Sequence, residues 1–145
     1  MKKLLVVGLV LLGASACEDS NAVYVEHLAI VNINPSHGAV GIGYTTDLTV
    51  TFSDVLDALT VSNATVCLTT ESAPPPDSAN PCGTGAPLAA TVTYDATTLS
   101  ARLVPAQPLV PDERYTLHLT TTIEGAKSGA LPAIVRSSFT TIPTS

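Results

Sequence analysis

Basic residues are scarce in this sequence of 145 residues. Six lysines and arginines stand against twelve aspartates and glutamates, and two of the six are Lys2 and Lys3. If residues 1–16 are removed, as predicted below, four basic residues remain and the net charge becomes −8. A chain with this charge repels nucleic-acid phosphates and anionic lipid headgroups. We therefore expect no nucleic-acid partner and no polybasic attachment to membranes.

The N-terminal apolar run is too short to cross a bilayer. Leu4–Leu12 is uncharged, but a spanning helix needs about 20 apolar residues. The run follows Lys2 and Lys3 and precedes the small residues Gly13–Ala16. A basic start, a short apolar core and a small-residue cleavage site are typical of a secretory signal peptide. We predict a signal peptide over residues 1–16, with a buried core helix as the alternative.

Cysteines are few, and their number is odd: Cys17, Cys67 and Cys82. An exported protein with an odd count has one cysteine left over, and Cys17 directly follows the predicted signal peptide. The sequence Ala14-Ser15-Ala16-Cys17 resembles the bacterial lipobox, although Ala14 stands where that motif prefers leucine. The resemblance implies a diacylglyceryl group on the Cys17 thiol and acylation, for example by palmitate, of the amine freed by cleavage. Plain secretion with a free Cys17 thiol is the alternative.

The predicted partner of Cys17 is therefore a membrane. Residues 17–26 are expected to be a lipidated tether, held by acyl chains that each contribute about 0.8 kcal/mol per buried methylene. The inner-membrane retention signal of some bacteria resembles Asp directly after the cysteine, whereas Glu18 occupies that position here. We expect an outer-membrane lipoprotein, with a secreted or periplasmic protein as the alternative.

Residues 27–143 predict one all-β domain. Seven segments with strand-like patterns are separated by turn residues, and they are residues 28–33, 47–52, 64–69, 88–94, 98–104, 114–121 and 133–141. Residues 54–60 predict one helical turn, and residues 70–87, 105–112 and 124–132 predict loops. About seven short antiparallel strands predict an immunoglobulin-like β-sandwich. The absence of tryptophan excludes the antibody-type signature of two cysteines around a tryptophan.

Alternation along these segments assigns side chains to the core. The inward set is Leu48, Val50, Phe52, Val66, Leu68, Leu99, Ala101, Leu103, Tyr115, Leu117, Leu119, Val135 and Phe139. Segment 28–33 is apolar on both sides and is expected to be a covered strand, whereas His118 is expected to face solvent. Tyr115 follows the proline-rich corner at 105–112, so it is a candidate corner tyrosine. An ordinary half-buried strand tyrosine is the alternative.

Two stretches resemble the SbsA-type bacterial Ig-like domain. In "INPSHGAVGIGYTTDLTVTFSDVLDALTV" the matching residues are Pro35, Gly38, Ala39, Phe52, Ser53 and Asp57. The stretch "VTYDATTLSARLVPAQPLVPDERYTLHL" and the ending "SSFTT" resemble its second half, so the likeness covers residues 28–142. The resemblance implies a non-enzymatic module of bacterial surface and secreted proteins, often present in tandem. This chain departs from it by having one copy and a proline-rich insertion with two cysteines.

Cys67 and Cys82 are expected to form a disulfide. They bracket most of the proline-rich loop, and export places them in an oxidising compartment. The bond would close a loop of 16 residues, which stabilises a fold by about 3 kcal/mol on the loop-entropy model. It would pin the loop to the sheet. Two free thiols are the alternative.

No residue set predicts catalysis, a resident metal or another cofactor. The three histidines, His27, His37 and His118, have no short ligand spacing, and no nucleophile elbow is present. Asp54 and Asp57 are a weak calcium candidate on one turn. The sequence "EHLAIVNINPSHGAVG" also resembles copper-binding proteins of the CopC type. That family begins at a histidine and carries a late Asp-x-His motif, and this chain lacks both features.

The sequence therefore predicts a non-enzymatic, lipid-anchored module of the bacterial cell envelope that binds, adheres or spaces. Its partner would be an envelope protein or a glycan, reached through an exposed sheet edge or the disulfide-pinned loop. A small periplasmic carrier of metal or ligand, with a CopC-like sandwich, is the alternative function.

Overall fold

The computed structural model describes residues 26–85 and 87–145. The predicted signal peptide, Cys17 and the tether up to residue 25 lie outside the described residues. Within them the chain is almost entirely β-structure, with one 3₁₀ helix, η3 (Ala58–Thr60), inside the segment predicted to make a helical turn. No helix of this part of the chain is long and apolar enough to cross a membrane. The all-β fold class is confirmed.

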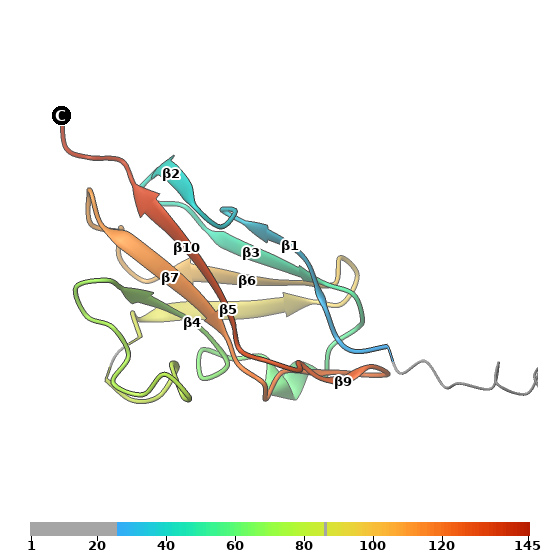
Figure 1. Ribbon diagram of the computed structural model, residues 1–145. Coiled ribbons are helices and arrows are strands. Elements are labelled where there is room, and N and C mark those ends of the chain that lie inside the picture. Colours follow the sequence, from blue (N-terminus) through green and yellow to red (C-terminus); the bar gives the residue numbers. More distant parts are fainter. Residues whose placement is uncertain (1–25, 86) are drawn as a thin grey trace, which may run out of the picture.

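Eight strands form two four-stranded sheets that make a sandwich (Figure 1). The first sheet contains, in spatial order, β1 (Ile30–Asn34), β3 (Leu48–Phe52), β6 (Ser100–Pro105) and β5 (Ala90–Asp95). The second contains β2 (Ala39–Ile42), β10 (Val135–Thr141), β7 (Arg114–Leu119) and β4 (Val66–Thr70). A short pair, β8 (Glu124–Gly125) and β9 (Gly129–Ala130), completes ten strands in the described residues, against about seven predicted.

The core lies between the two sheets, where alternate residues of each inner strand point inward. In β3, Leu48, Val50 and Phe52 are each 1% exposed. The other predicted core residues that are buried are Val66, Leu68, Ala101, Leu103, Tyr115, Leu117, Leu119 and Phe139. Val135 is half-buried and packs against this cluster. Each fully buried large side chain contributes about 1.5–3 kcal/mol to folding, so this cluster is the main source of stability.

The first predicted strand, residues 28–33, overlaps β1 but starts two residues too early, and the observed strand is not covered on both faces. β1 begins at Ile30 and lies at the edge of its sheet, paired only with β3. Val31 is 65% exposed, whereas Leu28, which precedes the strand, is buried. A register irregularity between Ile30 and Asn32 shifts the alternation here. An edge strand with one solvated face can carry a valine on that face, so the apolar run did not imply cover.

Strand β2 was not predicted, and it breaks the expected antiparallel pattern. The chain leaves the first sheet at Pro35, whose missing N–H ends the ladder of β1. Gly38, with φ of +82°, then turns the chain into β2. Residues 39–42 pair in parallel with β10 and thereby join the second sheet. β2 lies at the edge of its sheet and none of its residues is fully buried. Its sequence therefore lacks the alternation that predicts a strand.

Two turns also differ from expectation. Leu99 does not point inward from a strand, because it occupies the β5–β6 turn with φ of +56° and is only half-buried. The loop predicted over residues 124–132 contains the β8–β9 hairpin. Ile123 and Leu131 flank that hairpin and are buried at 0% and 3% exposure. Two isolated apolar residues around a segment rich in glycine and serine do not form an alternating pattern long enough to predict a hairpin.

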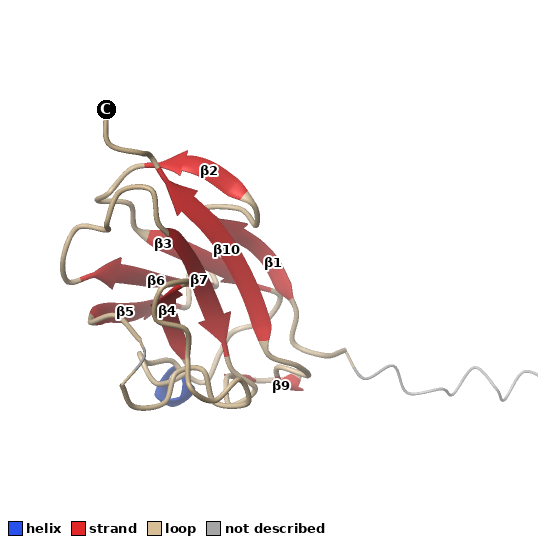
Figure 2. Cartoon of the chain, turned by 60° about the vertical axis from the view of Figure 1, so that its left-hand side comes forward, coloured by secondary structure: helices blue, strands red, loops and turns tan. Residues whose placement is uncertain are grey.

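The two ends of the described chain lie at opposite ends of the sandwich. Figures 1 and 2 both show the first described residues next to β9, while the C-terminus extends from the other end, beyond β10. A tether that precedes residue 26 would therefore meet the domain at the β8–β9 end.

Candidate functional site

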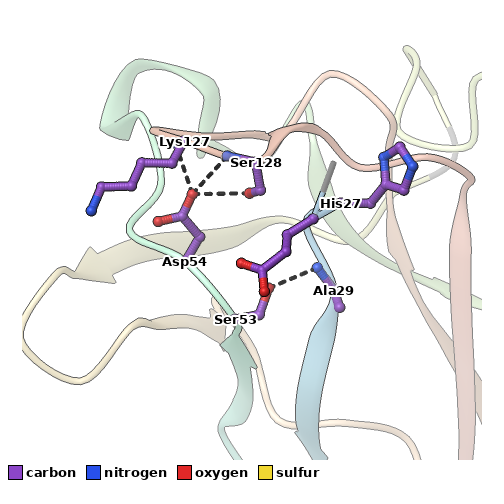
Figure 3. A pocket seen from close by; sticks show the side chains of 7 residues that line it. His27, Ala29, Ser53, Asp54, Lys127 and Ser128 are labelled. Carbon is purple, nitrogen blue, oxygen red and sulfur yellow. Dashed lines mark hydrogen bonds between the residues drawn. The ribbon is translucent and has the colours of Figure 1, made fainter. Parts of the chain in front are cut away.

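A pocket of about 840 Å³ opens at the β8–β9 end of the sandwich (Figure 3). Three segments supply its walls: the residues before β1, the end of β3 and the β8–β9 turn. The lining residues are Glu26, His27, Ala29, Ser53, Asp54, Lys127 and Ser128. Polar and charged side chains predominate among the lining residues.

Asp54 is the best-connected side chain of this pocket. Its Oδ2 accepts hydrogen bonds from the Lys127 N–H at 2.8 Å and from the N–H and hydroxyl of Ser128 at 3.0 and 2.9 Å. Its Oδ1 accepts from the N–H of Val55 at 2.7 Å. These bonds, that from Lys127 first, hold the pKa of Asp54 below its ordinary value of 3.8. The carboxylate thus fastens the β8–β9 turn to the end of β3.

The calcium candidates Asp54 and Asp57 serve different loops. Asp57 caps η3, because its carboxylate accepts the N–H of Leu59 at 3.0 Å. In the end pocket, the His27 ring is turned away from the Asp54 carboxylate (Figure 3). Residues 26–85 and 87–145 contain no group of three or more histidine, cysteine, aspartate or glutamate side chains placed to hold a metal ion.

Tyr115 is a corner tyrosine. Its ring is 1% exposed and stacks on Phe139 with the ring centroids 5.6 Å apart. Its hydroxyl accepts the N–H of Val110, five residues earlier, at 2.7 Å. The sequence left this role open, and the hydrogen bond decides it in favour of the corner.

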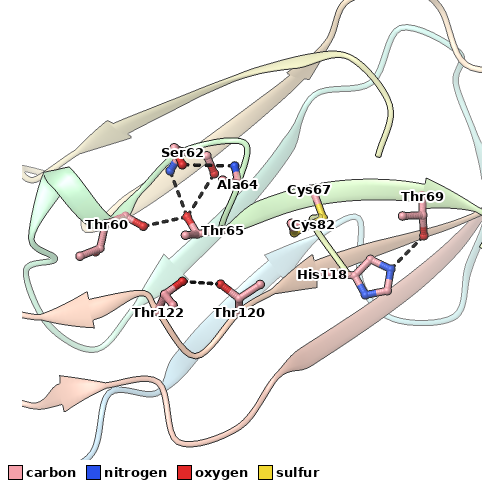
Figure 4. The surroundings of a disulfide bond; sticks show 10 residues. All are labelled: Thr60, Ser62, Ala64, Thr65, Cys67, Thr69, Cys82, His118, Thr120 and Thr122. Atoms are coloured by element: carbon pink, nitrogen blue, oxygen red, sulfur yellow. Dashed lines mark hydrogen bonds between the residues drawn. A yellow bond between two sulfur atoms is a disulfide. The ribbon is translucent and has the colours of Figure 1, made fainter. Parts of the chain in front are cut away.

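A disulfide joins Cys67 of β4 to Cys82, with the two Cα atoms 5.6 Å apart (Figure 4). Both cysteines are buried. We call residues 71–85 the flap, since this segment leaves β4 and the disulfide returns it to the same strand. The arrangement is the one that the two cysteine positions predict.

The strand alternation predicts that His118 faces solvent, and this prediction is wrong, because the residue is only 3% exposed. It does lie on the outer face of β7, directly between Cys67 of β4 and Arg136 of β10 in the strand register. Strand alternation gives the side of the sheet correctly but cannot show that a loop covers that side. The outward direction of Cys67 was the available signal, because a disulfide there brings the flap over its neighbours.

The buried imidazole is only partly satisfied. Its Nε2 lies 2.9 Å from the hydroxyl of Thr69, which is itself buried (Figure 4). Its Nδ1 is the only buried side-chain polar atom without a hydrogen-bond partner in the described residues. Burial, together with the charge of Arg136, lowers the pKa of His118 from 6.5 to about 4. The ring is therefore neutral at pH 7.

A groove of about 400 Å³ lies between the flap and this outer face. Its floor comes from β4, β7 and β10, and its wall from the flap. The lining residues are Thr69, Thr70, Glu71, Pro74, Pro75, Ser78, Arg114, Thr116, His118, Arg136 and Ser138. The guanidinium of Arg136 donates to the Ser78 carbonyl at 2.7 Å and so helps to hold the flap in place.

His37 belongs to neither site. Its Nδ1 accepts the N–H of Ser138 at 3.1 Å, which joins the turn before β2 to β10. The three histidines therefore lie in three separate places, as their sequence spacing suggests.

Comparison with known proteins places the chain in a family context. The family model described as a bacterial Ig-like domain matches residues 25–141. No curated protein sequence matches the chain. The family match covers both sheets, the flap and both pockets.

Solved structures share the fold at low sequence identity. CopC from Methylosinus trichosporium OB3b has a TM-score of 0.57 at 11% identity, and the match covers 82% of this chain and 97% of that one. The N-terminal part of the bacterial S-layer protein SbsC has a TM-score of 0.54 at 18% identity. That match covers 89% of this chain but only 26% of the S-layer chain, so this protein spans about a quarter of that relative.

Proposed function

Since the chain belongs to the family of bacterial Ig-like domains, we propose that it is a non-enzymatic module of the cell envelope, anchored by a lipid at Cys17. The SbsA-type motifs around Pro35 and Phe52 support a surface module of this kind. The domain would bind, adhere or space other envelope components. It would be exported and held at the outer membrane, because Glu18 occupies the position at which the inner-membrane retention signal has aspartate.

One observation carries the anchoring proposal: Cys67 and Cys82 are paired with each other, which leaves Cys17 as the odd cysteine. That cysteine directly follows the signal-like segment with its lipobox-like ending Ala14-Ser15-Ala16. A free thiol at such a position would be exposed to oxidation outside the cytoplasm. Lipidation converts it into an attachment point.

The position of the tether fits this role. Residue 26 lies at the β8–β9 end (Figures 1 and 2). The groove beneath the flap lies on the outer face of the second sheet. A chain anchored through its N-terminal segment would leave the groove, the flap and the strand edges available to partners.

Intact mass spectrometry of the protein from a bacterial host tests the anchor. We expect a mature terminus at Cys17 that carries the mass of acyl chains, and a Cys17→Ala variant without that mass. The variant should also move from the membrane fraction to the soluble fraction. An unmodified wild-type terminus in the soluble fraction would refute the anchor.

A small periplasmic carrier is the second candidate function, favoured by one observation. The end pocket brings His27 and Asp54 into one lining, in a fold that resembles CopC. Its Lys127 and the backbone N–H groups already bonded to Asp54 disfavour a cation there. Calorimetric titration of the protein with Cu²⁺ and with Ca²⁺ tests the metal-carrier form of this function, since such a carrier requires stoichiometric binding of at least one ion.

A further inference from the structure

The groove beneath the flap contains two arginines on an acidic protein. Arg114 and Arg136 both line it, against one carboxylate, that of Glu71. Within the described residues the only ion pair joins Arg102 to Asp47, on the other sheet. Neither groove arginine makes an ion pair within the described residues, although Asp112 and Glu113 line a neighbouring hollow together with Arg114. An unpaired guanidinium presents a fork of donors that matches a carboxylate.

The two arginines stand at separate points of the groove floor. Arg136 pairs with His118 across the strands, whereas Arg114 lies four residues before His118 on β7, about 13 Å along the strand. Between them lies the hydroxyl pair of Thr116 and Ser138, whose oxygens are 3.0 Å apart. A ligand that meets both arginines is therefore elongated, and it passes over hydroxyl groups.

The buried imidazole offers a third contact beside Arg136. If the Thr69 hydroxyl donates to Nε2 of His118, the ring proton is on Nδ1, which then is a donor without a partner. An unsatisfied buried polar group costs free energy that a ligand acceptor recovers. An anionic oxygen next to Arg136 is the acceptor that this donor would favour.

The composition of the lining selects among anionic ligands. Apart from the rings of Pro74 and Pro75, the groove presents no aliphatic or aromatic hydrocarbon side chain. Peptides that dock through apolar side chains need apolar pockets, which this groove does not offer beyond the two proline rings. An acidic peptide, which arginines also recognise, is one of the outcomes tested below. Hydroxyl groups flanked by proline rings suit a hydroxylated ring instead, whose oxygens bond to the threonines and serine and whose C–H face packs on proline.

We propose that the groove beneath the flap binds a short acidic saccharide with two carboxylates, one held by Arg136 and His118 and the other by Arg114. The first carboxylate takes the place of the Ser78 carbonyl on Arg136. The flap yields at that point but stays attached through Cys82. The sugar hydroxyls between the carboxylates bond to Thr116 and Ser138.

Calorimetric titration of the mature protein in detergent micelles with digalacturonate tests this proposal. We expect saturable binding, weakened about tenfold or more by Arg136→Gln and by Arg114→Gln, because each removes a charged hydrogen bond. Both arginines are exposed, so these variants should keep the fold, which thermal unfolding checks. Lys127→Gln, at the end pocket, is the matched control and should bind like the wild type.

Three competitor ligands separate the alternatives. A neutral digalactoside should bind at least tenfold more weakly than digalacturonate, and so should adipate, which has two carboxylates without sugar rings. A Glu-Glu dipeptide that binds more tightly than digalacturonate would overturn the saccharide assignment. Absence of digalacturonate binding, or binding unchanged by Arg136→Gln, would overturn the site itself.

The ¹⁵N signals of the His118 ring test its direct contact with the ligand, because a general charge effect would not shift one ring nitrogen more than the other. In ¹⁵N spectra of the histidine rings, digalacturonate should shift Nδ1 of His118 more than Nε2 and should raise the pKa of His118 above about 4. Unchanged His118 signals at saturation would overturn its role. The anchor at Cys17 is measured by mass, so failure of this proposal leaves the anchoring proposal standing.

Discussion

The two sheets present the same kind of face to the core but different faces to the outside. In the first sheet the outer residues are solvated: Arg102 and Thr93 are exposed, and Thr49 and Thr51 are half-buried. In the second sheet the corresponding residues Thr69, His118 and Ser138 are buried at 2%, 3% and 8% exposure. The flap, held by its disulfide, lies over these three residues, whereas Arg114 and Arg136 on the same face stay exposed. A covered outer face can hold polar groups in defined positions, which is what a binding site requires.

The core should be equally sensitive in both sheets, and this is the largest expected effect. Leu103→Ala in the first sheet and Leu117→Ala in the second each remove a leucine that is 1% exposed. We expect each to lower the free energy of unfolding by about 2–5 kcal/mol, measured by urea denaturation. A loss below 1 kcal/mol for either one would mean that its sheet does not share the common core.

Removal of the disulfide should affect the second sheet more than the first. The double variant Cys67→Ala, Cys82→Ala releases a closed loop whose ends are 15 residues apart, and the expected loss is about 3 kcal/mol. The lower global stability should speed the slowest hydrogen exchange in both sheets, and the loss of cover by the flap should speed exchange at β4 and β7 further than at β5 and β6. Equal acceleration in both sheets would show that the flap supports the whole fold instead of covering one face.

The covered histidine should make stability depend on pH. Folded His118 takes up a proton only near pH 4, whereas the unfolded chain does so near pH 6.5. Between these values the unfolded state binds more protons, so stability is complete above pH 6.5 and falls as the pH is lowered towards 4. The loss should reach about 2–3 kcal/mol. His118→Gln should abolish this part of the slope, and a slope unchanged by that variant would assign it to carboxylates.

A matched pair of threonines gives the finest test of the two outer faces. Thr69→Val leaves both ring nitrogens of His118 without partners and should cost about 1–3 kcal/mol. Thr93→Val, on exposed β5, should change stability by less than about 0.5 kcal/mol. Thermal unfolding of the two variants compares them directly. Similar losses would mean that burial under the flap adds nothing to the Thr69 hydrogen bond.

The sequence predicts the sandwich well because its inner strands alternate clearly. Leu48, Val50 and Phe52 are separated by threonines, and this strict alternation indicates a β-strand with one buried face. The edge strands lack that signal. β1 carries exposed Val31, and β2 has so little buried surface that it resembles a turn. Edge strands are held by backbone pairing more than by side-chain burial, so their sequences contain less evidence of structure.

The groove could be predicted only in part. Alternation places His118 and Thr116 on the outer face, and the two cysteines indicate a pinned loop. Their combination, a loop that lies over His118, depends on where the flap crosses the sheet, and the sequence does not encode that path in any local pattern. Long-range partners such as Arg136 and Ser78 are likewise visible only once the strands are paired.

The central claim is that the flap converts the outer face of the second sheet into a covered polar site around His118. Titration of the His118 ring by NMR, in the oxidised wild-type protein, tests it most directly. The account predicts a pKa of about 4 and one dominant neutral tautomer with the proton on Nδ1. A pKa near the ordinary 6.5, with fast exchange between tautomers, would show an open and solvated histidine and would contradict the claim.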